Sequence, residues 1–184
     1  HAEGELLLTL ISAVAQNESQ NLSDNIKWGL RRKYETGNIQ SVPCGKIYGY
    51  TKVDGQFIIK EAEANVVRRM YQEFLDGYSV TQIAAHLTAE GIPTNQGLEE
   101  WSPSTIHQML QNEKFKGDML FQKTYNIDHV TKKRAVNNGE LVKYYVRGSH
   151  PAIVDEATWE CVQLERERQK RFCEEHHITT YHHS

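Results

Sequence analysis

Short hydroxyl and amide side chains gather in residues 102–112, where Ser102 followed by Pro103 is a typical helix start. The apolar residues at helical spacing are Ile106, Met109 and Leu110. The polar side chains on the opposite face are Ser102, Ser104, Thr105, His107, Gln108, Gln111 and Asn112. Groups of these types hydrogen-bond to base edges and phosphates in the major groove of DNA. The stretch predicts a DNA-reading helix, with an ordinary helical hairpin of polar outer face as the alternative.

Basic side chains lie in two blocks of an otherwise acidic chain. The net charge is −3, yet residues 26–60 hold seven Lys or Arg against two acids, and residues 101–150 hold eight against four. Phosphate contacts require such blocks, although alternating charge also marks a solvated surface. The candidate DNA contacts in the two blocks, beyond the helix, are Lys27, Arg31, Arg32, Lys33, Lys46, Tyr48, Lys114, Lys116, Lys132, Lys133 and Arg134. Packing in the core is the alternative for Tyr48.

The three cysteines, Cys44, Cys161 and Cys173, are far apart and odd in number, which argues against a disulfide framework. We therefore expect a reducing, cytoplasmic setting. Several histidines follow Cys173, but no second cysteine stands close enough for a structural zinc site, so we expect no metal and no cofactor. The longest apolar stretch, Leu6–Ala15, is shorter than the ~18 residues of a membrane span, and we expect no membrane anchor and no signal peptide.

One long amphipathic helix is predicted from Glu3 to about Thr36. Its apolar residues, spaced by three, four and seven, are Leu7, Leu10, Ile11, Val14, Ala15, Leu22, Ile26 and Leu30. About 33 residues at 1.5 Å each make a helix of roughly 50 Å, which is too long for so small a domain to cover. We therefore expect self-association through this helix, or its contact with a further domain.

The remaining predicted elements are short. The helices are expected over residues 61–76, 80–90, 102–112 and 155–170. Leu75 is expected on the buried side of the first of these, and Asp54-Gly55 is a strong hairpin turn signal. Strands at 119–121 and 141–146 are expected to flank a long, mobile, basic hairpin arm. The predicted fold class is mainly α with small β (α+β): a long N-terminal helix, a helical domain containing a helix-turn-helix-like pair, and short β-hairpins.

Four stretches carry a family resemblance by their order and spacing. They are Glu5–Ser19 with Asn25–Gly29, then Pro43–Tyr50, then Ser79–Ala84 with Gly91–Thr94 and Trp101–Ile106, and finally His150–Glu160. In these stretches the chain resembles the large serine recombinases, which include phage integrases and transposon resolvases. The resemblance implies a protein that binds double-stranded DNA in site-specific integration, excision or transposition. It also implies that the first helix links a catalytic domain to the DNA-binding region.

The resemblance further implies a domain division. The end of the linker helix takes residues 1–37, the recombinase DNA-binding domain residues 38–170, and a tail or the start of a following region residues 171–184. The family's serine nucleophile belongs to a domain before the linker helix, and no matching motif occurs here, so we assign no catalytic residue and expect the chain alone not to be an enzyme. Neither Cys161 nor Cys173 matches the paired cysteines of the family's zinc ribbon. The alternative function is a helical protein–protein interaction module without DNA contact, which the long apolar stripe and net acidic charge favour.

Overall fold

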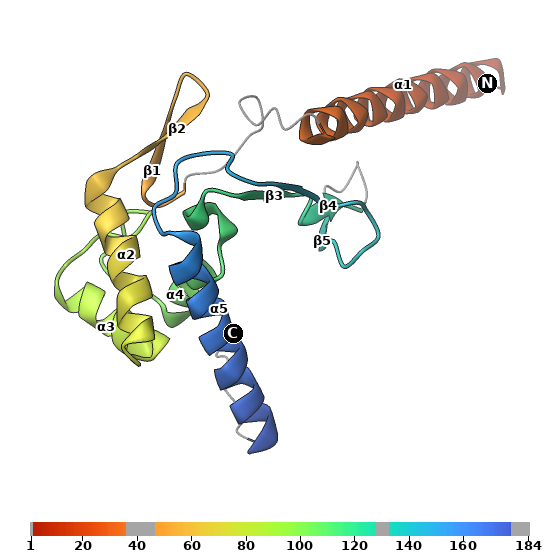
Figure 1. Ribbon diagram of the computed structural model, residues 1–184. Helices are drawn as coiled ribbons and strands as arrows, with labels where there is room; N and C mark the ends of the chain where they lie inside the picture. The colour runs from red at the N-terminus through yellow and green to blue at the C-terminus, as the bar shows by residue number, and fades with distance from the viewer. Residues whose placement is uncertain (1, 36–46, 128–132, 178–184) are drawn as a thin grey trace. The chain divides into compact units, whose positions relative to one another are not determined.

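A computed structural model describes residues 2–35, 47–127 and 133–177 (Figure 1). Over these residues the chain forms five α-helices, one 3₁₀ helix and six short strands arranged in three two-stranded sheets. The mixed α+β class expected from the sequence is confirmed. The chain divides into two compact units, the first made of residues 1–43 and 120–146, the second of residues 44–119 and 147–184.

The first unit contains the long helix α1 (Ala2–Glu35), as predicted. Large apolar side chains along α1 are exposed, namely Ile11, Val14, Leu22, Ile26 and Trp28. In the same unit β4 (Thr124–Asn126) pairs antiparallel with β5 (Arg134–Val136), and the tip of this hairpin, residues 128–132, lies outside the described residues. β3 (Met119–Phe121) pairs with β6 (Tyr144–Val146), so the second predicted strand begins three residues later than expected.

The second unit opens with an antiparallel hairpin of β1 (Tyr50–Val53) and β2 (Gln56–Ile59). Its turn residues, Asp54 and Gly55, both have positive φ, as the two-residue turns of tight hairpins require. The helices that follow are α2 (Glu61–Leu75), α3 (Val80–Ala89), α4 (Pro103–Leu110), the 3₁₀ helix η1 (Glu113–Lys116) and α5 (Glu156–Glu175).

The core of the second unit forms around α2. Fully buried side chains from its elements include Val67, Met70, Tyr71, Ile83, Leu87, Ile106, Leu110, Phe115 and Val162. The prediction for Leu75 is wrong, since this side chain is 38% exposed. Leu75 lies 100° around the helix from the buried Phe74, which takes the core position in that turn. Helix α5 runs five residues past its predicted end, with ion pairs such as Arg168–Glu165 along its exposed face.

Candidate functional site

Helix α4 presents its polar face to solvent. The Ser102 hydroxyl caps the helix by accepting a hydrogen bond from Thr105 N at 3.2 Å, and Pro103 occupies the first turn. The apolar side chains of α4 are buried, as predicted. The predicted contact residues Ser104, His107, Gln108 and Gln111 are exposed, whereas Thr105 is half-buried. The local sequence thus places a row of hydrogen-bonding groups on one open helix face.

The C-terminal end of α4 is held by side chains from two other helices. Tyr71 of α2 is 1% exposed, and its hydroxyl lies 3.1 Å from Met109 O and 3.3 Å from Leu110 O. Gln163 Nε2 of α5 donates to the same Leu110 carbonyl at 2.7 Å. The anchored residues Met109 and Leu110 stand between Gln108 and Gln111 in the chain. The hydrogen bonds therefore fix the orientation of the exposed face within the second unit.

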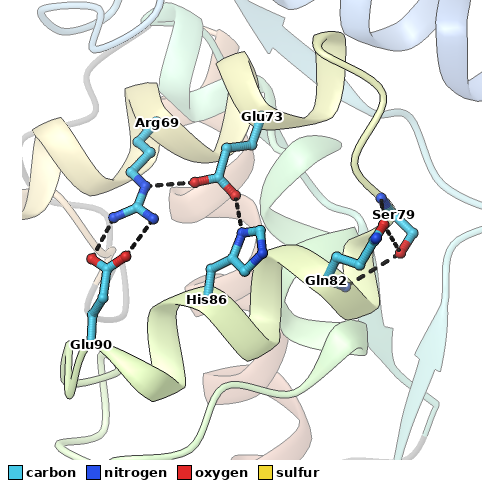
Figure 2. Close-up of polar contacts among 6 residues, drawn as sticks. All are labelled: Arg69, Glu73, Ser79, Gln82, His86 and Glu90. Carbon is cyan, nitrogen blue, oxygen red and sulfur yellow. Dashed lines mark hydrogen bonds and ion pairs between the residues drawn. The ribbon is translucent and has the colours of Figure 1, made fainter.

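Helix α3 is fixed to α2 by a cluster of ion pairs, drawn in Figure 2. Arg69 Nε donates to Glu73 at 2.6 Å, while both terminal nitrogens of Arg69 bond Glu90 at 2.5 and 2.6 Å. His86 Nδ1 lies 3.0 Å from the other Glu73 oxygen. The Arg69 guanidinium holds the pKa of Glu90 below its usual value. At the start of α3, Ser79 and Gln82 form the capping box that Figure 2 also shows.

A groove of about 540 Å³ lies beside the polar face of α4. Its lining residues are Ile47, Tyr48, Thr94, Asn95, Gln96, Leu98, Glu100, Ser102, Thr105, Gln108, Met109, Asn112, Lys114 and Phe115. Predicted contact residues therefore meet here from α4, from η1 and from the segment before β1. The loop residues Asn95 and Gln96 were not among the predicted contacts. An amide pair followed by Gly97, in a turn next to a DNA-reading helix, is the sequence signal that could have found them.

Lys114 lines this groove, and its main-chain carbonyl accepts hydrogen bonds from two side chains of the second unit. The Tyr50 hydroxyl lies 3.2 Å from Lys114 O, and His150 Nε2 donates to the same oxygen at 2.7 Å. Burial lowers the pKa of His150, and the hydrogen bond to Lys114 O opposes that shift only in part. A neutral His150 thus supports the turn that carries Lys114.

Two other predicted contacts are engaged within the protein. The Lys116 amine lies 3.2 Å from both Asp118 and Glu156, and 4.6 Å from the centre of the Trp159 ring. Its side chain is only 9% exposed, so its charge is balanced inside the second unit. Tyr48 is buried, with its hydroxyl donating to Pro93 O at 3.2 Å and its ring edge-on to Trp101. Burial and the nearby Glu63 raise the pKa of Tyr48, which keeps the hydroxyl a donor.

The remaining predicted cations belong to the first unit or lie outside the described residues. Four cluster near the C-terminal end of α1, and all are exposed: Lys27, Arg31, Arg32 and Lys33. The Lys27 amine pairs with Asp24 at 3.4 Å, and the Arg32 guanidinium stands 5.5 Å from the centre of the Trp28 ring. Lys133 and Arg134 are exposed at the start of β5. Lys46 and Lys132 fall in the parts of the chain that the structure does not describe.

Two further findings concern metal ligands and membrane spans in the described ranges. No group of three or more His, Cys, Asp or Glu side chains among them is arranged to hold a metal ion. None of the helices described has an apolar stretch long enough to cross a membrane. Cys161 is exposed, Cys173 is half-buried, and the histidines at 182 and 183 lie outside the described residues.

Comparison with known proteins identifies relatives. A family model described as Recombinase matches residues 61–169. A protein of Bacillus subtilis (strain 168) described as "Putative DNA recombinase" is 27% identical over 173 residues, which are 88% of this chain and 34% of that protein. The chain therefore spans about a third of the length of this curated relative.

Two solved structures share the fold. One, described as an LSR–DNA complex, aligns with a TM-score of 0.53 and 20% identity over 79% of this chain and 38% of its own. Another, from work on the sequence requirements of the Listeria innocua prophage attP site, aligns with a TM-score of 0.54 and 20% identity over 78% of this chain and 52% of its own.

Proposed function

This chain belongs to the Recombinase family of the large serine recombinases, and from that premise we propose that it binds double-stranded DNA. The observation that carries the proposal is the open polar face of α4, which is rich in the hydroxyl and amide groups that read base edges. We propose that the whole protein recombines DNA at specific sites, in integration, excision or transposition. The part described here supplies binding, since its sequence contains no motif resembling the family's nucleophilic serine.

In this proposal the roles are divided between base reading and phosphate contact. Gln108 and Gln111 of α4 face the bases of one half-site, and Lys114 lies at the groove beside them. Residues 1–37 serve as the linker helix and residues 38–170 as the DNA-binding domain. The cations at the end of α1 contact phosphates, together with Arg134 of β5 and Lys133 just before it. Lys116 and Tyr48 are left out of the contact set because each is already engaged within the protein.

The phosphate role is tested by salt titration of DNA binding. Each phosphate contact contributes about 0.9 to the slope of log affinity against log salt, so replacing Lys27, Arg31, Arg32 and Lys33 with Ala should flatten the slope by up to about 3.6. The loss should fall short of that figure, because the Lys27 amine is partly neutralised by Asp24. Affinity should drop equally for all sequences, measured by fluorescence anisotropy on a labelled duplex of random sequence.

The control variant replaces Arg168 and Lys170 of α5, which are exposed cations already paired with Glu165 and Glu174. It should bind with an almost unchanged slope. An unchanged slope in the α1 variant would remove α1 from the contact surface. If the unaltered chain fails to bind any duplex at low salt, the DNA proposal itself is refuted.

The second candidate function is a helical protein–protein module, and exposed apolar residues favour it. Ile11 and Val14 of α1 are each more than half exposed, as are Leu22 and Trp28. A helix with this surface can pair with a second copy of the chain. Self-association without DNA binding in the same titrations would select this alternative, whereas self-association together with binding is compatible with the recombinase role.

A further inference from the structure

The loop that faces α4 across the groove is a stiff turn. Thr94 N donates to Leu98 O at 2.9 Å, and Leu98 N donates back to the Thr94 hydroxyl at 3.0 Å. Gly97 closes the turn with its N–H bonded to Thr94 O and a φ of +77°, a conformation that favours glycine. The backbone of residues 94–98 is thus tied internally, while the side chains of Asn95 and Gln96 stay exposed.

Both ends of this turn are fixed to the core of the second unit. Before it, Pro93 O accepts the Tyr48 hydroxyl and Ile92 O accepts Trp101 Nε1 at 2.7 Å. After it, Trp101 N donates to the Thr88 hydroxyl of α3 at 2.9 Å. Trp101 is 3% exposed and packs edge-on against Tyr48. Two buried aromatic anchors thus fix the backbone that carries the exposed amides before any partner arrives, which lowers the entropy cost of binding.

The chemistry of the groove favours one kind of base pair. Amides line it from both sides, Asn95 and Gln96 from the turn and Gln108 from α4. Asn and Gln are the side chains that bond adenine through its N6 and N7 atoms, and apolar side chains contact the thymine methyl group. Leu98, which is 57% exposed, supplies an apolar surface in the same groove.

Guanine is disfavoured by the same lining. Arg and Lys are the usual partners of its two acceptors. Among the described lining residues there is one cation, Lys114, and one carboxylate, Glu100. A carboxylate cannot bond the two acceptors of guanine, although it can accept from the N4 amine of cytosine. The amides and the exposed Leu98 outnumber the two charged residues, so the lining points to adenine and thymine.

We propose that the turn at residues 94–98 is a second DNA-reading element, which selects A·T base pairs together with α4. Asn95, Gln96 and Gln108 bond adenine, and Leu98 contacts the thymine methyl group. This inference rests on the proposed DNA-binding function and deepens it, because it assigns base selection to a loop as well as to a helix.

The test is selection of duplexes from a randomised library by the full chain. The unaltered chain should enrich a motif with A·T pairs, and the double variant Asn95→Ala, Gln96→Ala should lose one or two of these positions. Discrimination at those positions should fall roughly fivefold to hundredfold, the usual worth of a good amide–adenine pair. Affinity for random duplex should change by less than about twofold, since no phosphate contact is removed.

The matched control is Gln72→Ala, which removes an exposed amide on α2 outside the groove and should leave the selected motif unchanged. The methyl contact has its own test. Deoxyuridine in place of thymidine in the selected duplex should weaken binding of the unaltered chain about fourfold, the worth of one methyl group, and should not weaken binding of Leu98→Ala.

The outcomes separate this inference from the proposed function. If the double variant binds and selects the same motif as the unaltered chain, the loop is not a reading element, although DNA binding stands. If the positions that it loses are G·C pairs, the A·T assignment is overturned. If the unaltered chain enriches nothing and binds no duplex, the proposed function fails first. A thermal melt that matches the unaltered chain confirms that each variant is folded.

Discussion

Replacing Tyr71 with Phe tests how α4 is held in position. The Tyr71 hydroxyl is buried between α2 and the end of α4, within hydrogen-bond distance of Met109 O and Leu110 O. Burial raises its pKa, so the phenol remains protonated and acts as a donor. Phe keeps the ring and its packing, and the substitution removes one hydrogen-bond donor without opening a cavity of any size.

The expected loss of stability depends on the hydrogen bonds that the Met109 and Leu110 carbonyls keep after the substitution. Met109 O still accepts Asn112 N at 3.1 Å, and Leu110 O still accepts Gln163 Nε2 at 2.7 Å. No acceptor is left without a donor, so Tyr71→Phe should lower the free energy of unfolding by about 1 kcal/mol, the net worth of one hydrogen bond. Gln163→Met should cost somewhat more, because it also removes the Gln163 Oε1 that accepts from Arg166 Nη1 at 2.7 Å, although Leu110 O then keeps Tyr71.

Together the two substitutions should cost more than the sum of their separate effects. Leu110 O would then lose both side-chain donors, and a buried carbonyl without a partner costs about 1–3 kcal/mol. We expect a coupling free energy of about 1 kcal/mol between positions 71 and 163. The measurement is urea unfolding followed by tryptophan fluorescence, since Trp101 and Trp159 both lie in the second unit.

The control is Tyr78→Phe, which alters an exposed tyrosine and should change stability by less than about 0.5 kcal/mol. Additive effects at positions 71 and 163, within about 0.3 kcal/mol, would refute the shared acceptor. An almost neutral Tyr71→Phe would mean that the end of α4 does not depend on this anchor.

Two further predictions concern the support of Lys114. Burial lowers the pKa of His150 in the folded protein, so on acidification this histidine is protonated first in the unfolded chain. Stability should therefore be greatest above the ordinary histidine pKa of about 6.5 and should fall as the pH drops below it. Urea midpoints at several pH values should show this loss in the unaltered chain and a flatter profile in His150→Gln; equal profiles would contradict it. Gly117→Ala should destabilise the second unit, because φ is +88° and the new Cβ would stand 2.7 Å from His150 O. The control is Gly77→Ala, which has a similarly strained φ but whose new Cβ would meet nothing within 4 Å. In thermal melts it should cost only the roughly 1 kcal/mol of the left-handed backbone. Equal losses of stability in the two variants would exclude the clash at Gly117.

Local signals in the sequence predicted the helix starts well. Ser79, Ser102 and Asp155 all cap helices as expected, because a cap needs only its own side chain and the next few N–H groups. The polar face of α4 was predictable for a similar reason, since helical periodicity separates its two sides. The prediction failed at Leu75, because periodicity did not separate the two adjacent apolar residues Phe74 and Leu75, of which only Phe74 is buried.

The state of single side chains in the candidate site depended on residues far away in the sequence. Lys116 pairs with Asp118, two positions later, and also with Glu156, 40 positions later, while Tyr48 bonds Pro93, 45 positions later. No local pattern links Lys116 to Glu156 or Tyr48 to Pro93, so the sequence indicated Lys116 as an open contact and left Tyr48 between DNA contact and packing in the core. The turn at residues 94–98 is closed by its own local hydrogen bonds, but its attachment to the core depends on the aromatic pair Tyr48 and Trp101, which no local pattern shows.

The charge distribution is compatible with the DNA recognition proposed for this acidic chain. The described lining of the α4 groove carries one cation and one carboxylate, so long-range attraction to phosphates at this surface is weak. A base-reading surface gains from this, because strong attraction to phosphate would bind all sequences alike and conceal differences of about 1–3 kcal/mol per base pair. Affinity then has to come from other cations, and α1 carries Lys27, Arg31, Arg32 and Lys33 in its last turns. In the proposed function, sequence selection and general attraction belong to separate units, so the substitutions in α1 and in the 94–98 turn should change different observables.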